Sequence, residues 1–196
     1  MKQSIIIVTL VIYSFIGFSQ SFSGGFMIGA GGSQIDGDEQ SGYKKPGFIG
    51  GAYISRKLSE NISFKIESYY IGKGAVLNID QADGTVYQQF NTSLHYIEMP
   101  FLIAFTLHPK IEIALGIAPS YLFEHKLTQD RFLIDKSMYS LNSLDFQPIG
   151  QVDFFLTDKI ITSLRFSYSI TDVRKEDNMA IWKNNNISIV LRYKIK

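Results

Sequence analysis

The sequence predicts an all-β fold: an eight-stranded antiparallel transmembrane β-barrel with short periplasmic turns and long extracellular loops. Three segments, at 58–62, 107–111 and 156–160, share one pattern of a Leu, three turn-type residues and an Ile, and each begins 49 residues after the last. Each joins two runs of alternating apolar and polar residues, so each is expected to close a hairpin. Longer polar stretches separate the hairpins. Short turns at one end and long loops at the other are the layout of a transmembrane barrel.

Eight runs carry apolar side chains at every second position, the period of a strand with one apolar face. An even number of strands suits a closed antiparallel barrel with both termini on the short-turn side. Pro100, Pro119 and Pro148 lie inside runs, and we expect β-bulges there because proline lacks a ladder donor. The clearest runs are 62–70, 96–107, 111–124, 146–156, 160–169 and 187–195, and glycine-rich runs at 22–33 and 47–58 complete the set.

The apolar face of these strands is expected to meet lipid. The opposite face holds many small residues, such as Gly116 and Ser163, which suit the cramped interior of an eight-stranded barrel. The alternative, a soluble lipocalin-like barrel, would have an exterior crowded with Lys and Glu. Tyr70, Tyr121 and Tyr168 fall near the long-loop ends of three strands. They predict an aromatic girdle at that membrane surface.

Charged residues on the small-residue face are expected to form a network inside the lumen, because buried charges must pair. Asp153 should lie opposite Ser163 and therefore diagonal to Arg165, which predicts an Asp153–Arg165 pair with Glu67 as the rival partner. A network that fills the lumen is the favoured interpretation, and proton or ion conduction is the alternative. The four cations and four anions are Lys65, Glu67, Glu98, Glu112, Asp153, Arg165, Arg192 and Lys194.

The first 19 residues predict a secretory signal peptide, which leaves residues 20–196 as the outer-membrane barrel domain. Lys2 precedes an apolar run at 5–18, and Gly17-Phe18-Ser19 places small residues at the −3 and −1 positions. Cleavage is therefore expected between Ser19 and Gln20. The alternative is an uncleaved anchor, but the run is short for a membrane span. The chain has no cysteine, which excludes disulfides and a lipid-modified cysteine.

Neither the composition nor the motifs of the chain indicate nucleic-acid binding, catalysis or metal binding. The 196 residues fit one domain, and a net charge of +1 gives no reason to expect nucleic acid as a partner. The histidines, His95, His108 and His125, have no Ser or carboxylate at a spacing that forces a catalytic triad. The acidic segment at 36–39 lacks the spacing of an EF-hand. We expect no enzyme activity, no cofactor and no metal, with a small lipid-modifying outer-membrane enzyme as an alternative.

The segment Tyr96-Ile97-Glu98-Met99-Pro100 is the most distinctive of the chain, together with the glycine-rich strand at 24–32 and the stretches 33–38, 41–51 and 67–74. These segments resemble the PorT-like outer-membrane β-barrel family, whose members are often described as porin family proteins. The resemblance implies an eight-stranded barrel in the outer membrane of a Gram-negative bacterium, and it carries over no catalytic residues. The member that names the family is associated with type IX protein secretion.

We therefore expect a monomer in contact with outer-membrane lipid, with a side-chain-plugged lumen and a structural or interaction role. An accessory component of a type IX-like secretion system is the alternative. Protein partners would bind the long loops. Asp83-Gly84 reads as a hairpin turn, so the strands on either side are expected to extend beyond the membrane between about residues 73 and 94. The four loops are expected at 33–46, 73–94, 125–145 and 171–186.

Overall fold

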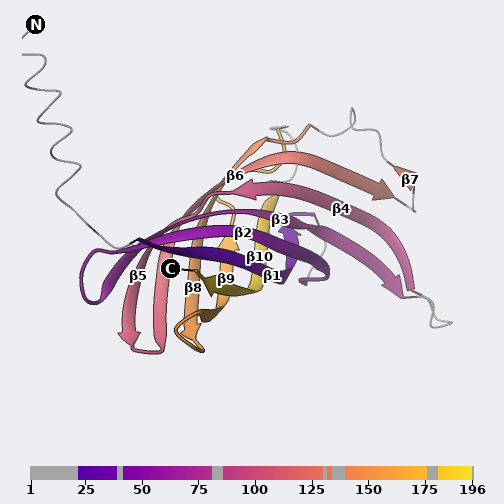
Figure 1. The fold of residues 1–196 in the computed structure, drawn as a ribbon. Helices are drawn as coiled ribbons and strands as arrows, with labels where there is room; N and C mark the ends of the chain where they lie inside the picture. The colour runs from indigo at the N-terminus through magenta and orange to yellow at the C-terminus, as the bar shows by residue number, and fades with distance from the viewer. Residues whose placement is uncertain are drawn as a thin grey trace, which may run out of the picture.

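A computed structural model describes residues 22–38, 42–80, 86–129, 132–133, 140–175 and 181–195. The expected signal peptide and the Asp83-Gly84 turn lie outside these residues. Within them there is no helix long and apolar enough to cross a membrane. The described residues form ten strands (Figure 1): β1 (Phe22–Asp36), β2 (Lys45–Lys57), β3 (Ile62–Asp80), β4 (Val86–Glu98), β5 (Phe101–His108), β6 (Ile111–Gln129), β7 (Phe132–Leu133), β8 (Leu144–Phe155), β9 (Ile160–Tyr168) and β10 (Lys183–Lys194).

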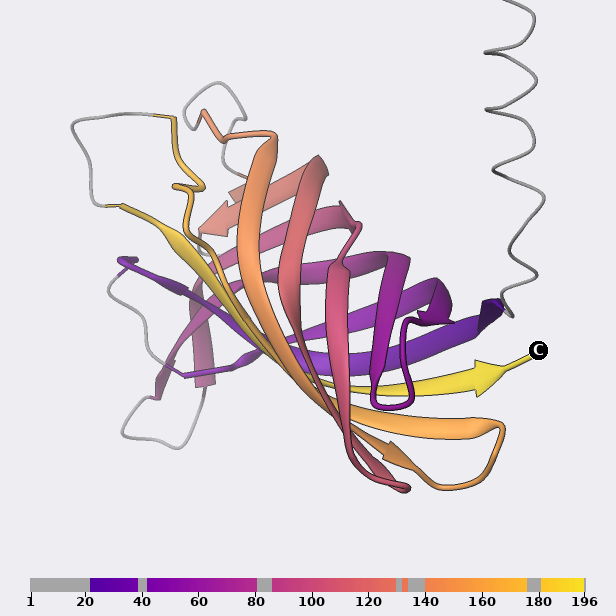
Figure 2. The same cartoon turned by 90° about the vertical axis from the view of Figure 1, so that its left-hand side faces the viewer.

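The strands close into an antiparallel ring in the order β2–β1–β10–β9–β8–β6–β4–β3, and the β2–β3 pairing completes it. Figure 2 shows the C-terminal strand (yellow) beside the N-terminal strand (indigo), which pair along most of their length. β4 and β5 are two halves of one barrel strand, because both pair with β3 on one side and β6 on the other. β7 pairs only with the end of β6. The wall therefore has eight strands, and the predicted barrel is confirmed.

The three repeated segments form the predicted hairpin turns, which join β2 to β3, β5 to β6 and β8 to β9. In the first and third turns the amides of Leu58 and Leu156 donate to the carbonyls of Ile62 and Ile160, both at 2.9 Å. Each 49-residue interval between successive turns holds one strand that leads to the loop side and one strand that returns from it.

Three strands continue past the ring on the loop side. Pairing of β2 with β3 ends at Ile71, but β3 continues to Asp80 against β4, and β4 pairs with β6 up to Gln129. Figure 1 shows β3, β4 and β6 curving away from the other strands, with β7 at the tip of β6. β3 and β4 stay paired from Lys73 and Leu94 to Asp80 and Val86, so the predicted continuation of these two strands is present. We call this part the loop-side sheet: residues 72–80, 86–95, 122–129 and 132–133.

The bulges predicted at Pro100, Pro119 and Pro148 are wrong. Pairing between β6 and β8 runs through Pro119 and Pro148 without a shift of register, and Pro119 lies opposite Phe146. Pro100 separates β4 from β5, yet its carbonyl still accepts a hydrogen bond of 3.0 Å from the amide of Glu67. A proline removes one donor from the ladder but keeps its acceptor. The bonds on either side are enough to hold the register here.

Side chains alternate between the lipid-facing wall and the lumen, as a strand requires. On β6, Leu115 and Ile117 are 58% and 53% exposed, whereas Ala114 and Ala118 are fully buried. The lumen holds two apolar clusters. The smaller cluster comprises Leu102, Ala104, Ala114, Ala118 and Ile149. The larger one lies toward the loops and includes Leu141, Val173 and Trp182 from outside the barrel strands.

Candidate functional site: two polar networks in the lumen

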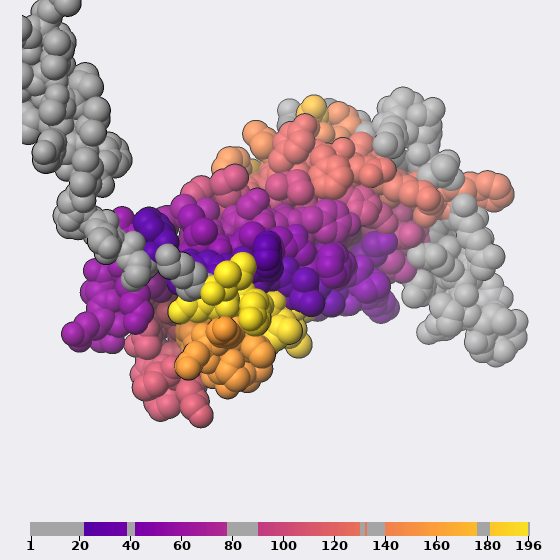
Figure 3. Space-filling model, viewed as in Figure 1, coloured from indigo at the N-terminus to yellow at the C-terminus, as the bar shows by residue number. Residues whose placement is uncertain are grey.

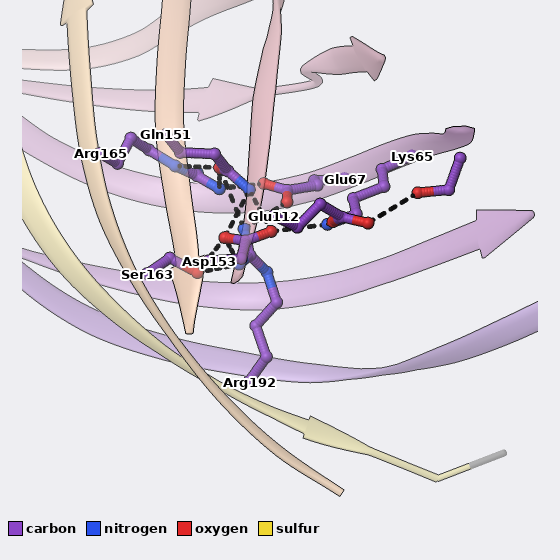
Figure 4. Close-up of polar contacts among 9 residues, drawn as sticks. Lys65, Glu67, Glu112, Gln151, Asp153, Ser163, Arg165 and Arg192 are labelled. Carbon is purple, nitrogen blue, oxygen red and sulfur yellow. Dashed lines mark hydrogen bonds and ion pairs between the residues drawn. The ribbon is translucent and has the colours of Figure 1, made fainter. Parts of the chain in front are cut away.

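The first network lies toward the short turns and is called the turn-side network (Figure 4). Its charged members come from β3, β6, β8, β9 and β10, and they meet because inward positions of all five strands face the same narrow lumen. None is more than 7% exposed. The network comprises Lys65, Glu67, Glu112, Asp153, Arg165 and Arg192, with Gln151 and Ser163 as neutral bridges.

Glu67 joins two guanidinium groups at the centre of this network. Its Oε2 atom accepts from Arg165 Nη2 at 2.6 Å, and its Oε1 atom accepts from Arg192 Nη2 at 2.6 Å. Gln151 Oε1 accepts from Arg165 Nε at 3.0 Å and from Arg192 Nη2 at 3.2 Å. Because Glu67 belongs to β3 and its partners to β9 and β10, these bonds cross the lumen from one wall to another.

Asp153 is the second bridging carboxylate. Its Oδ1 atom accepts from Ser163 Oγ at 2.5 Å and from Arg192 Nη1 at 3.0 Å, and its Oδ2 atom accepts from Lys65 Nζ at 2.6 Å. Lys65 also pairs with Glu112, which lies directly opposite Asp153 on the neighbouring strand. Two facing carboxylates would repel each other. Lys65 removes that repulsion by binding both.

The structure corrects the predicted partner of Arg165. Asp153 does lie opposite Ser163, as predicted. Arg165 lies opposite Gln151, and its guanidinium binds Glu67 across the lumen rather than the diagonal Asp153. The reason is that Lys65, Ser163 and Arg192 already surround the Asp153 carboxylate, whereas Glu67 lies within reach of a side chain as long as arginine.

The turn-side network is balanced in charge, because its three cations meet three carboxylates. Aromatic rings cover the two guanidinium groups. Arg165 lies 5.1 Å from the ring centroid of Tyr69, and Arg192 lies 5.8 Å from that of Tyr53. Contacts of this kind stabilise a desolvated cation. Each buried charge thus has an opposite charge as its partner, although Arg165 Nη1 and Arg192 Nε are buried without a hydrogen-bond partner among the residues that the structure describes.

A second group, the loop-side network, lies nearer the long loops and is built around Glu98. Glu98 pairs with Lys73 and accepts hydrogen bonds from Tyr69 at 2.8 Å and Ser120 at 3.1 Å. Lys73 Nζ also donates to Gln147 Oε1 at 2.7 Å, and it lies 5.6 Å from the ring centroid of Tyr96. One lysine therefore links β3, β4 and β8 across the lumen.

Asp145 extends the loop-side network to β10 and to the segment that follows β9. Its carboxylate accepts from Gln147 at 2.8 Å, Ser169 at 2.6 Å, Thr171 at 2.5 Å and Asn184 at 3.0 Å. Four neutral donors hold this carboxylate, in contrast to the arginines and lysine of the turn-side network. Asp145 is only 2% exposed, so the wall encloses the loop-side network as it encloses the turn-side network.

Sequence reasoning missed Lys73 and Asp145, and the signal for both was present. Lys73 has the parity of Lys65, Glu67 and Tyr69, and Asp145 has the parity of Asp153. The alternating runs of the sequence end at Tyr70 and begin again at Phe146, so Lys73 and Asp145 fall in the expected loops at 73–94 and 125–145. The strands run further, to Asp80 for β3 and from Leu144 for β8.

The remaining predicted residues lie outside the two networks: Lys194 and Tyr168 at the ends of strands, and Tyr70 and Tyr121 in the middle of β3 and β6. Lys194 is half-buried near the end of β10, and its amide donates to the carbonyl of Lys159 at 2.8 Å. Its side chain joins neither network in the described part of the chain. Tyr70 and Tyr121 flank Ile97 on the outer wall. Tyr168 is the last residue of β9.

An aromatic cluster surrounds Tyr70 on the outer wall. Its hydroxyl lies 2.7 Å from His95 Nδ1, the two rings stack at 5.9 Å, and Phe123 lies 6.2 Å from Tyr70. His108 lies in a short turn, where its Nδ1 atom accepts from the amide of Lys110 at 3.2 Å. Among the described residues, no group of three or more His, Cys, Asp or Glu side chains is placed to hold a metal ion.

Comparison with known proteins agrees with this geometry. The family described as "Outer membrane protein beta-barrel domain" matches residues 14–175. A solved structure of Ail, the attachment invasion locus protein of Yersinia pestis, has a TM-score of 0.53 and 8% identity, and the match covers 88% of this chain and 98% of that one. For Neisserial surface protein A the values are 0.56, 12%, 89% and 97%. No curated protein matches the chain. At these identities the two structures bear on the fold alone.

Proposed function

Because the chain belongs to the outer membrane protein β-barrel family, we propose that it is a barrel with a side-chain-plugged lumen and a structural or interaction role through its extracellular part. The observation that carries the proposal is the turn-side network, whose ion pairs join Glu67 on β3 to Arg165 and Arg192 on β9 and β10. Side chains that are bonded from wall to wall leave little room for a continuous water path in an eight-stranded barrel.

The apolar clusters support the same proposal, because they lie in the lumen together with the charges. Leu102, Ala104 and Ala114 are fully buried. On the loop side, Val173 donates its amide to the carbonyl of Trp182 at 2.9 Å, and Leu141 bridges to Arg174. These segments bring Leu141, Val173 and Trp182 into the larger apolar cluster. An ion crossing the barrel would have to displace both apolar clusters and polar networks.

Planar-bilayer recording tests the plugged lumen. Pure, folded protein is expected to give no steady single-channel current, because the ion pairs of Glu67 and Asp153 span the lumen. The barrel fold of the same sample is checked by its circular dichroism. Steady, voltage-independent steps of uniform size from folded protein would contradict the proposal.

The loop-side sheet supports an interaction role. It extends beyond the barrel ring as paired strands rather than as a plain loop. Phe132 in this sheet is 79% exposed. Ile170, two residues after β9, and Ile181, two residues before β10, are 61% and 60% exposed. Exposed apolar side chains on extracellular segments are suited to contact with a partner protein. We also propose that the chain is a member of the PorT-like family, that it is a monomer and that it has no enzyme activity.

Export by a cleaved signal peptide is also part of the proposal. The mature protein is expected to begin near Gln20 and to fractionate with the outer membrane, because Gly17-Phe18-Ser19 follows a short apolar run. Mass spectrometry of the purified membrane protein measures the amino terminus directly. An intact Met1, or recovery of the protein from the soluble periplasm, would contradict this expectation.

A further inference from the structure

The lipid-facing wall has a groove where β1, β10 and β9 meet. Cross-strand pairing places Phe26, Tyr193 and Ile160 in one outward row and pairs Ile28 with Leu191 in the next. These five side chains, with the stems of Met27 and Arg192 behind them, line a cavity of about 210 Å³. Figure 3 shows this region of the surface, with the C-terminal strand (yellow) between β1 (indigo) and the β8–β9 hairpin (orange).

An open pocket adjoins the apolar groove at its short-turn end, where the turn between β8 and β9 meets Tyr193. It has a volume of about 400 Å³ and is lined by Thr157, Asp158, Lys159, Ile160 and Tyr193. Ile160 and Tyr193 line both spaces. An elongated amphipathic ligand would therefore find an apolar channel in direct continuity with an open end that Thr157, Asp158 and Lys159 line.

The turn that carries the open pocket is held in a fixed shape. Thr157 Oγ1 accepts from the amides of Lys159 and Ile160 at 3.2 and 3.0 Å, and the Lys159 carbonyl accepts from the Lys194 amide at 2.8 Å. The Lys159 side chain is exposed, and Tyr193 is 51% exposed. Both residues line the pocket next to the groove, so an ammonium group and a phenol hydroxyl are available there.

The charge of this end of the barrel favours an anionic group. Among the described residues, the exposed and half-buried side chains of the short turns and adjoining strand ends carry five cations against two carboxylates. The cations are Arg56, Lys57, Lys110, Lys159 and Lys194, and the carboxylates are Glu60 and Asp158; Glu112 near the same end is buried and paired with Lys65. Asp158, next to Lys159 in the turn, offers a carboxylate to a positive group. The pair is therefore complementary to a zwitterionic headgroup.

We propose that the groove and pocket together bind one glycerophospholipid of the periplasmic leaflet. One acyl chain lies along Phe26, Ile28 and Leu191, and the phosphate is bound by the Lys159 ammonium and the Tyr193 hydroxyl. The inference rests on the proposed orientation, in which the short turns face the periplasm. A larger, multiply acylated lipid A and a second copy of the barrel are the competing occupants, and the experiment below separates them.

The 49-residue repeat provides matched control sites. Lys110 and Ile111 occupy the same places in the β5–β6 turn as Lys159 and Ile160 in the β8–β9 turn, but they do not line the groove or the pocket. Lys159→Gln removes the phosphate partner from an exposed turn. Ile160→Trp places a larger side chain at the position that lines both the groove and the pocket, and so fills the space between them. Lys110→Gln and Ile111→Trp make the same chemical changes outside the site.

Native mass spectrometry of the folded protein in detergent, titrated with palmitoyl-oleoyl-phosphatidylethanolamine, measures binding. The wild type is expected to retain one phospholipid. Lys159→Gln should weaken binding about tenfold, the size of one charge-assisted hydrogen bond, and Ile160→Trp should abolish it. Both control variants should bind as the wild type does.

Several results would overturn the inference. Equal binding by all five proteins would mean that only non-specific boundary lipid is present, and equal loss in the controls would remove the site. Retention of lipid A in preference to phosphatidylethanolamine would contradict both the site and the proposed orientation. A dimer lost in Ile160→Trp would assign the groove to a second copy. Failure to retain phospholipid would overturn this inference but not the proposal of a plugged lumen, because bilayer recording tests that proposal separately.

Discussion

Replacing Glu67 by Gln is expected to destabilise the folded barrel by about 3–5 kcal/mol, the usual cost of removing one partner from a buried ion pair. Glu67 is 1% exposed and is the direct ion-pair partner of both Arg165 and Arg192. The glutamine keeps the shape of the side chain but removes its charge. Arg165 then has only Gln151 beside it, and Arg192 retains Asp153.

Reversible unfolding of Glu67→Gln and wild type in lipid vesicles measures this cost. Glu60→Gln is the matched control, because Glu60 is an exposed residue of a short turn. It should change the free energy of unfolding by no more than about 0.5 kcal/mol. A cost below about 1 kcal/mol for Glu67→Gln, within the range of exposed ion pairs, would show that water reaches these charges.

Replacing Leu115 by Lys is expected to cost about 2–4 kcal/mol of folding free energy in bilayers, the penalty for a lysine facing lipid at mid-depth. Leu115 is 58% exposed on the outer wall and lies opposite Ile103 and Gly150 of the neighbouring strands. The penalty should fall toward Ile111 at the short turn and toward Phe123, where β6 enters the loop-side sheet, because lysine there can reach the headgroups.

A lysine scan along one strand measures this depth profile. The positions are the outward residues Ile111, Ile113, Leu115, Ile117, Tyr121 and Phe123. The free energy of unfolding in vesicles should show its largest loss at Leu115 or Ile117. In detergent micelles without a fixed thickness, the same variants provide the control. A flat profile in vesicles would contradict a wall that faces lipid.

The wall of the barrel was predictable from the sequence because its causes are local. The alternation of side chains at 111–124 reflects one apolar and one lumenal face, and the short turns carry residues that favour tight reversal. The prolines misled the prediction for the opposite reason. Whether Pro119 forms a bulge depends on the bonds of both neighbouring strands, and β5 and β8 hold the register there.

The partners within the lumen were not predictable from the sequence. Parity shows which charges point inward, but contacts across the lumen depend on the stagger of strands around the whole ring. Glu67 and Arg165 are 98 residues apart in the chain and meet only when the ring closes. The parity of Lys73 and Asp145 marks both side chains as inward, but their partners depend on the same ring closure, since Glu98 comes from β4 and Asn184 from β10.

Thiol accessibility tests the plugged lumen most directly, because the natural chain has no cysteine and a single introduced one is the only reactive thiol. Ala118→Cys places the thiol in the lumen at a fully buried position, and Phe132→Cys places it at a site that is 79% exposed. In folded protein in vesicles, a water-soluble maleimide is expected to label Phe132→Cys within minutes and to leave Ala118→Cys unlabelled until the barrel is unfolded. Labelling of both folded variants at similar rates would show a water-filled lumen and contradict the account.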